Sequence, residues 1–257
     1  ALATTEVDIS QVQPGNSITV LWRGKPIFLK RRTPEEIAEA RAVNLSDLPD
    51  PQKDEDRVKE FIIFTSVDTW GKQAEYIRNG LEFNRFWDNM NKILEKCPRV
   101  NLTIMSTYNA LSVPNYDKLI NDVYKLKTKY GTPDRYWNSA VFLDSSYLRF
   151  PQHQTVQVLP DIWNQEIIKQ AQLVDYYSVL WGAEYQNKMP GYSDVEIQKI
   201  KRLYDWMISA DDRNAINRQR YNFGKFFKEH DIRRGTNFKE TFPEFAEFYE
   251  DCQRIKL

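Results

Sequence analysis

The first 32 residues alternate between apolar and polar side chains, which is the pattern of strands with one buried face. Strands are predicted over residues 6–9, 18–22 and 26–30, and a Gly-containing turn joins the last two as a hairpin. Thr33 and Glu36 are spaced as a capping box around Pro34, which predicts that a short helix begins there. Residues 1–45 are therefore expected to form a small antiparallel β segment with one short helix.

The pattern changes after residues 46–59, a polar, proline-containing stretch that is the best candidate for a linker. Residues 61–67 form a continuous apolar run, typical of a strand that is buried on both faces. Further strands are predicted at residues 100–108 and 140–143, with apolar helical stripes between them at residues 83–97 and 116–124. Strands that alternate with helices imply parallel, right-handed crossovers, so residues 60–160 are expected to be an α/β sheet or part of a β/α barrel.

The last part of the chain, residues 161–257, shows helical periodicity throughout. Ser193 and Glu196 are spaced as a second capping pair, which predicts the start of one of these helices. Thr241 is expected to begin the last helix, whose apolar stripe ends at Cys252. The predicted fold class is therefore α/β with a helical C-terminal region.

Composition narrows the possible chemistry. The chain has 36 basic residues (Lys and Arg) and 36 acidic residues (Asp and Glu), so no overall positive charge favours a nucleic acid as partner. No run of 18 or more apolar residues occurs, so no membrane span is expected. The two cysteines, Cys97 and Cys252, are far apart and end helical stripes, so they are predicted to pack as small apolar residues rather than to bind metal.

The first part of the chain resembles a known family. The residues concerned run from 6–9 through Trp22-Arg23-Gly24-Lys25-Pro26-Ile27-Phe28 to Arg32-Thr33-Pro34-Glu35-Glu36-Ile37, followed by Asp50-Pro51-Gln52 and Asp56-Arg57-Val58-Lys59. This ordered series is similar to the Rieske iron–sulfur subunit of cytochrome bc complexes. The resemblance implies that residues 1–59 are base strands of a Rieske fold, from a protein of electron transfer.

The same resemblance predicts no cluster in this chain. A Rieske cluster needs a Cys-Thr-His-Leu-Gly-Cys loop and a second Cys/His loop, because two thiolates hold one iron and two imidazoles hold the other. Neither loop follows Lys59, and the two histidines, His153 and His230, lie in unrelated contexts. They are interpreted as surface or packing residues, and no metal ligand and no catalytic residue are predicted.

Residues 60–257 resemble the later half of a radical S-adenosylmethionine protein of the twitch-domain type. The resemblance rests on residues 64–68, 75–83 and 105–109, on 148–151 with 158–160, and on 230–238 with 241–245. It implies about three strands of a six-stranded partial barrel, with ancestral S-adenosylmethionine and an iron–sulfur cluster as cofactors. The Cys-x-x-x-Cys-x-x-Cys loop that holds the four-iron cluster in that family is not in this sequence. No cofactor is therefore predicted for this chain alone.

Five residues are candidates for cofactor binding. Ser66 and Asp68 follow a buried strand, and ligands of α/β sheets bind at the carboxyl ends of the strands. The resemblance implies that these two contact ribose hydroxyls, that Arg78 holds the cofactor carboxylate, and that Ser106 and Asn109 meet the ribose or methionine part. The alternatives are turn capping for the serines, Asp68 and Asn109, and a structural ion pair for Arg78.

Three hypotheses about function remain open. The first is a truncated or degenerate radical-S-adenosylmethionine-type protein, expected to be inactive as this chain alone. The second is a Rieske subunit fragment of electron transfer, fused to an unrelated segment, and the third is a structural or binding remnant. The resemblance to Rieske subunits implies a location at the outer face of an energy-transducing membrane. The resemblance to radical S-adenosylmethionine proteins implies a location in the cytoplasm. Self-association through an exposed edge of strand 61–67 is also predicted.

Overall fold

The structure is a computed structural model that describes residues 7–22, 24–51, 61–132, 140–184, 191–209 and 213–256. It divides the chain into two compact units, Ala1–Lys59 (unit 1) and Glu60–Leu257 (unit 2). The predicted linker therefore ends at the boundary between the units, although most of it, residues 52–59, lies outside the described residues. Each unit is described below by itself.

Unit 1 is built on a two-stranded antiparallel hairpin. Strand β1 (Ser17–Trp22) pairs with β2 (Lys25–Lys30), and the register runs from Ser17 opposite Lys30 to Trp22 opposite Lys25. The connection is two residues long, and its second residue, Gly24, has φ +74°, a conformation that glycine adopts without steric cost. The hairpin that the alternating pattern predicted is thus confirmed.

Helix α1 (Pro34–Ala42) follows and begins as predicted. Thr33 Oγ1 accepts a hydrogen bond from the Glu36 amide at 3.2 Å, and Glu36 Oε2 accepts one from the Thr33 amide at 2.9 Å. A short 3₁₀ helix, η1 (Leu45–Asp47), comes next. In the described part of unit 1 the only buried apolar side chain is that of Val12, so this unit has almost no core of its own.

The strand expected at residues 6–9 is not present at positions 7–9, and residue 6 lies outside the described residues. Asp8 Oδ1 accepts the Ser10 amide at 2.8 Å, and the Val12 amide donates to the Ile9 carbonyl at 3.1 Å. These short-range bonds make a turn, because an aspartate side chain competes for the amide two residues on. The prediction of a strand here was wrong for residues 7–9.

Unit 2 contains a three-stranded parallel sheet in the order β3-β4-β5, formed by β3 (Phe61–Ser66), β4 (Val100–Tyr108) and β5 (Val141–Tyr147). Phe61 is paired with Val100, and Leu102 with Val141. Helices α3 (Gly71–Ile77) and α4 (Phe83–Lys96) connect the first pair of strands. The 3₁₀ helix η2 (Ala110–Asn115) and helix α5 (Tyr116–Tyr130) connect the second pair.

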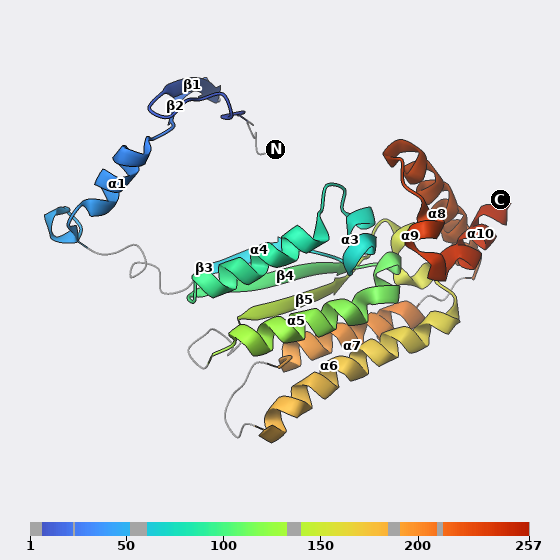
Figure 1. Ribbon diagram of the computed structural model, residues 1–257. Helices are drawn as coiled ribbons and strands as arrows, with labels where there is room; N and C mark the ends of the chain where they lie inside the picture. Colours follow the sequence, from blue (N-terminus) through green and yellow to red (C-terminus); the bar gives the residue numbers. More distant parts are fainter. Residues whose placement is uncertain are drawn as a thin grey trace. The chain divides into compact units, whose positions relative to one another are not determined.

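The remainder of unit 2 is helical, as predicted. Three short 3₁₀ helices, η4 (Gln152–Gln154), η5 (Val156–Val158) and η6 (Asp161–Trp163), lead into α6 (Asn164–Glu184), α7 (Asp194–Ile208) and α8 (Arg213–Arg234). The chain ends with α9 (Phe238–Thr241), η7 (Pro243–Phe245) and α10 (Ala246–Arg254). Figure 1 shows α6 and α7 running beside α5, while α8, α9 and α10 gather near the end of the sheet where the strands finish.

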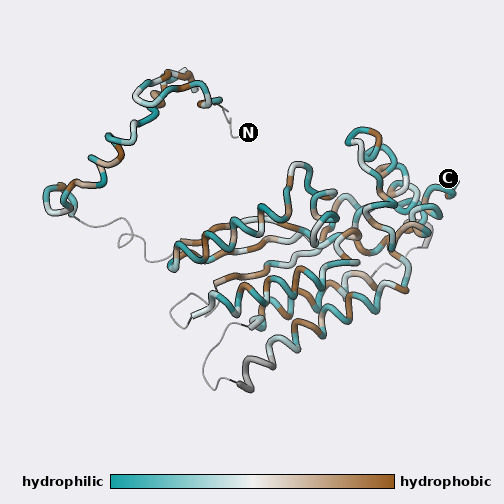
Figure 2. Tube along the Cα trace, in the orientation of Figure 1, coloured by the Kyte–Doolittle hydropathy of each residue, from teal (hydrophilic) through white to brown (hydrophobic). Residues whose placement is uncertain are grey.

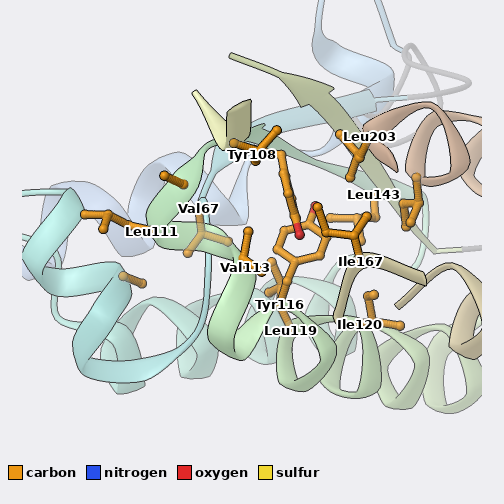
Figure 3. Packing of buried hydrophobic residues seen from close by; sticks show 14 of the residues in the cluster. Val67, Tyr108, Leu111, Val113, Tyr116, Leu119, Ile120, Leu143, Ile167 and Leu203 are labelled. Atoms are coloured by element: carbon orange, nitrogen blue, oxygen red, sulfur yellow. The ribbon is translucent and has the colours of Figure 1, made fainter. Parts of the chain in front are cut away.

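The core of unit 2 lies between the sheet and the helices that cover it. Apolar positions follow the strands and recur along α5, α6 and α7 (Figure 2). Tyr108 from β4 and Tyr116 from α5 meet edge to face at 4.7 Å between ring centroids, with Leu143, Ile167 and Leu203 around them (Figure 3). All of these side chains are buried, so residues from the sheet, α5, α6 and α7 share one core.

Three details of unit 2 differ from the prediction. Residues 61–67 were expected to form a strand buried on both faces, but β3 is an edge strand of the sheet and its Phe61 and Phe64 are 55% and 65% exposed. Cys97 was expected to pack in the α4 stripe, but α4 ends at Lys96 and Cys97 is exposed at its C-cap. The last helix begins at Ala246 rather than Thr241, because a short helix and a 3₁₀ turn around Pro243 come first. Within the described residues, no helix is long and apolar enough to cross a membrane.

Candidate functional site

The polar residues predicted to bind a cofactor lie at the carboxyl ends of β3 and β4, and two of them are bonded to each other. Arg78 donates from Nε to Asp68 Oδ2 at 2.9 Å and from Nη2 to Asp68 Oδ1 at 3.1 Å. The Thr107 amide also donates to Asp68 Oδ1, at 2.8 Å. The Asp68 side chain is 6% exposed and that of Arg78 37%. The carboxylate therefore ties the end of β3 to the end of β4 and to Arg78, the C-cap of α3.

The other three candidates occupy strand ends and turns. Ser66 is the last residue of β3, and Ser106 is buried in β4, opposite Ser145 of β5. Asn109 is the N-cap of η2: its Oδ1 accepts the Leu111 amide at 2.9 Å. Its Nδ2 donates to the Thr107 carbonyl at 3.0 Å, so both ends of this amide have backbone partners.

A cluster of hydroxyl groups lies beneath these strand ends. The Tyr116 hydroxyl is 2.6 Å from Ser145 Oγ in a fully buried position. Burial raises the pKa of Tyr116 above its ordinary value, and the hydroxyls of Ser106 and Ser145 offset part of that shift. A neutral, hydrogen-bonded phenol of this kind stabilises the core between β4, β5 and α5.

The five predicted residues thus come together at one end of the sheet, and Asp68, Arg78 and Asn109 each have partners within the protein. These are the contacts expected of the structural alternatives, an ion pair and a turn cap. Cofactor binding by these five residues stays a prediction. In the described ranges no three His, Cys, Asp or Glu side chains are grouped so that they could hold a metal ion.

The two histidines and Asp231 make packing contacts in unit 2. His153 lies 5.0 Å from the Phe226 ring and His230 lies 4.4 Å from the Tyr76 ring. Asp231 accepts hydrogen bonds from the Tyr76 hydroxyl and the Phe238 amide, both at 2.8 Å. This carboxylate therefore joins α8 to α3 and α9, and each histidine ring contacts an aromatic ring.

A basic hollow beside the sheet was not identified from the sequence. It has a volume of about 250 Å³ and is lined by Ser145, Ser146, Tyr147, Arg149, Lys199 and Arg202. The first three residues end β5, and Lys199 and Arg202 lie one turn apart on α7. The spacing of Lys199 and Arg202 was visible in the sequence, but nothing there showed that α7 packs beside β5.

Comparison with known proteins concerns only a part of the chain. Over 59 residues the chain is 56% identical to the ubiquinol-cytochrome c reductase iron-sulfur subunit of Rickettsia felis, a match that covers 23% of this chain and 33% of the relative. Over 71 residues it is 49% identical to the cytochrome b-c1 complex subunit Rieske-1, mitochondrial, of Nicotiana tabacum, covering 27% and 28%. The corresponding subunit of Solanum tuberosum is also 49% identical over 71 residues. This segment is Rieske-like.

The extent of these matches limits what they show. The chain spans roughly a quarter to a third of the length of the Rieske relatives that it matches. No family model matches the chain, and no solved structure matches it. The resemblance of residues 1–59 to Rieske subunits is therefore supported for a segment, whereas the resemblance of residues 60–257 to radical S-adenosylmethionine proteins rests on sequence motifs alone.

Proposed function

We propose that unit 1 is the cluster-free base segment of a Rieske-type iron–sulfur protein, and that it takes part in electron transfer by completing a β fold whose cluster lies elsewhere. The observation that carries this proposal is the 49–58% identity to Rieske subunits over 59–71 residues. The hairpin supports it, since an isolated two-stranded hairpin is at best marginally stable in water and needs further strands.

Both faces of the hairpin expose apolar side chains that further strands would cover. On one face, Val20, Trp22, Ile27 and Leu29 line an open hollow of about 330 Å³ together with Val7. On the other face, Leu21 is 71% and Phe28 73% exposed. Side chains this apolar are normally buried in a folded domain, so unit 1 has the surface of one layer of a larger β structure.

Fragment complementation tests the proposal. The full chain is mixed with a Rieske iron–sulfur protein from which the matching segment has been removed, and co-elution and the EPR signal of the [2Fe–2S] cluster are measured. We expect a complex that Phe28→Asp abolishes, because a carboxylate would be buried in the new interface. Phe150→Asp is the matched control, since Phe150 is 81% exposed in unit 2. Absence of a complex with the unaltered chain would leave unit 1 as a structural remnant.

We also infer, as a second candidate, that unit 2 is a degenerate half barrel of the radical S-adenosylmethionine type, without radical chemistry in this chain alone. Three consecutive parallel strands with helices between them favour it, together with the convergence of Ser66, Asp68, Ser106 and Asn109 at the strand ends. Reductive cleavage of the cofactor needs an electron from an iron–sulfur cluster, for which this chain lacks the three-cysteine loop.

Calorimetric titration of the full chain with S-adenosylmethionine tests this candidate. We expect a Kd weaker than about 1 mM, because Arg78 is already committed to Asp68 and the iron that anchors the cofactor is not supplied. Micromolar affinity that Arg78→Ala abolishes would show instead that unit 2 retains a working cofactor site.

A further inference from the structure

We propose that unit 2 binds the phosphate group of a small phosphorylated molecule in the hollow between the end of β5 and α7. This goes beyond the functions proposed above, because the hollow belongs to unit 2 alone and includes none of the five residues predicted to contact S-adenosylmethionine. The argument depends on the charge of the hollow, on the donors that line it and on its size.

Positive charge exceeds negative charge around the hollow. Arg149, Lys199 and Arg202 all line it. Lys199 is paired with Asp144 at 2.5 Å, with both side chains about one quarter exposed. In the described part of the chain, no carboxylate lies within ion-pair distance of Arg149 or Arg202. Two guanidinium groups that share one hollow without an anion repel each other, and an anion bound between them removes that repulsion.

The donors around the hollow suit the several oxygens of a phosphate. A guanidinium presents several N–H donors in a planar fork that matches phosphate, and hydrogen bonds between charged groups are stronger than neutral ones. Arg202 Nε donates a hydrogen bond to the Gln198 carbonyl oxygen in the same helix, at 3.2 Å. Ser146 is exposed at the rim, where its hydroxyl donates a long hydrogen bond to Asp144 Oδ1 at 3.5 Å, and this rotatable group is a further donor for an anion.

Contacts within the protein restrain Tyr147 and Arg149 at the rim of the hollow. Arg149 Nη2 donates to the Tyr147 hydroxyl at 2.9 Å, and its guanidinium carbon lies 5.1 Å from the centre of the Tyr147 ring. Trp206 of α7 also stacks on that ring, at 4.8 Å between centroids with an angle of 20° between the planes. A side chain held in this way loses less entropy when it binds an anion.

The size of the hollow indicates a small ligand. Its volume of about 250 Å³ is below the roughly 300–1,000 Å³ of sites for drug-sized molecules and cofactors. A phosphate with a short substituent fits, whereas a dinucleotide does not. The chain as a whole has no net charge, so no overall positive field favours a nucleic acid as the ligand.

Titration calorimetry of the full chain tests the proposal with three probes at equal ionic strength: inorganic phosphate, methyl phosphate and succinate. We expect saturable binding of the phosphates with a Kd on the order of 1 mM or tighter, and weaker binding of succinate. Tighter binding of methyl phosphate than of inorganic phosphate identifies a phosphate ester as the ligand, and equal binding identifies free phosphate.

Two substitutions on α7 show whether phosphate binds at the hollow or is attracted only by the general positive charge of the helix. Arg202→Gln removes a lining cation and should weaken phosphate binding about tenfold, which corresponds to about 1.4 kcal/mol. Lys201→Gln removes the same charge one residue away, where Lys201 pairs with Asp175 of α6, and should leave the affinity within about twofold. Circular dichroism confirms that both variants are folded. Equal losses in the two variants, equal binding of succinate, or no saturable phosphate binding would each overturn the proposal.

Discussion

At the scale of single residues, Asp68 shows how a polar group at a strand end can serve the fold. Its two oxygens accept three hydrogen bonds, two from Arg78 and one from the Thr107 amide. Although β3 is only partly buried, the position of Asp68 just after this strand was predictable from the apolar run before it. Its partner was not, because Arg78 is ten residues away and reaches Asp68 only after α3 has formed.

The two cysteines differ in their surroundings and should differ in reactivity. Cys97 is exposed, whereas Cys252 is 1% exposed and burial raises the pKa of its thiol to about 12. Since the thiolate is the reactive form, an aromatic disulfide reagent at about pH 8 should modify Cys97 quickly and Cys252 only after unfolding. Thiol release in the native and the denatured protein measures this. Cys97→Ser should remove the fast phase, and a fast phase that survives in this variant would contradict the structure.

At the scale of elements, a buried ion pair joins α5, α7 and β5. Lys127 Nζ lies 2.9 Å from Glu196 Oε1, and the two side chains are 0% and 1% exposed. Glu196 also accepts the Leu143 amide at 2.8 Å and the Ser193 amide at 2.8 Å. The capping box predicted from Ser193 and Glu196 is confirmed, but the sequence did not show that this cap also holds a lysine 69 residues away.

Removal of one partner of this pair should be costly. Lys127→Met leaves the Glu196 carboxylate buried without its cation, which should lower the free energy of unfolding by about 3–5 kcal/mol. The double variant with Glu196→Gln should recover part of the loss, because a neutral amide can still accept the Leu143 amide. Urea denaturation measures both, with Lys125→Met as the control, because Lys125 is 73% exposed on the same helix. A double variant no more stable than Lys127→Met would show that the loss comes from packing and not from unpaired charge.

Helices α8 and α10 approach each other closely at Gly224. A Cβ atom added there would lie 3.0 Å from the carbonyl carbon of Cys252 and 3.1 Å from its oxygen. Glycine to alanine in a helix interior usually stabilises by about 0.5–1 kcal/mol, but overpacking against backbone costs about 1–3 kcal/mol. We expect Gly224→Ala to lower the midpoint of urea denaturation, and an increase would mean that α10 shifts without cost.

The elements of unit 2 were more predictable than the contacts between them. Strand β4 and helices α4 and α5 follow from local periodicity, because one face of each element is apolar, and β3 follows from a continuous apolar run. The basic hollow depends on α7 packing beside β5, and the packing of Asp231 on Tyr76 joins residues 155 positions apart. Local sequence patterns carry no information about contacts between distant residues. The sequence therefore predicted which residues lie at the strand ends, but not which residues they contact.

At the scale of the whole molecule, the two units differ in how much core each has. Unit 2 has a shared core of buried apolar residues, whereas the described part of unit 1 buries only Val12 among its apolar side chains. Unfolding free energy comes mainly from buried apolar surface, so unit 1 should open more easily than unit 2. This difference agrees with the proposal that unit 1 completes a larger fold.

The edge of the sheet in unit 2 leads to the last prediction. Strand β3 is the terminal strand in the order β3-β4-β5, and its Phe61 and Phe64 are 55% and 65% exposed. A charged side chain is the usual protection of an edge strand against pairing with another chain. Residues 61–64 contain none. We therefore expect the full chain to self-associate through β3 at concentrations on the order of 100 µM.

Sedimentation velocity with Phe64→Lys tests this association. A lysine on the exposed side of β3 should shift the protein toward the monomer, whereas Phe150→Lys, at a side chain 81% exposed outside the sheet, should not. Hydrogen exchange then shows whether strand 61–66 is covered. Strong protection of residues 61–66 and 17–30 together in a protein that stays monomeric would overturn the prediction, because the hairpin of unit 1 would then have completed the sheet of unit 2. In that case the chain would be a true fused domain, in which the Rieske-like hairpin pairs with strands of the same polypeptide.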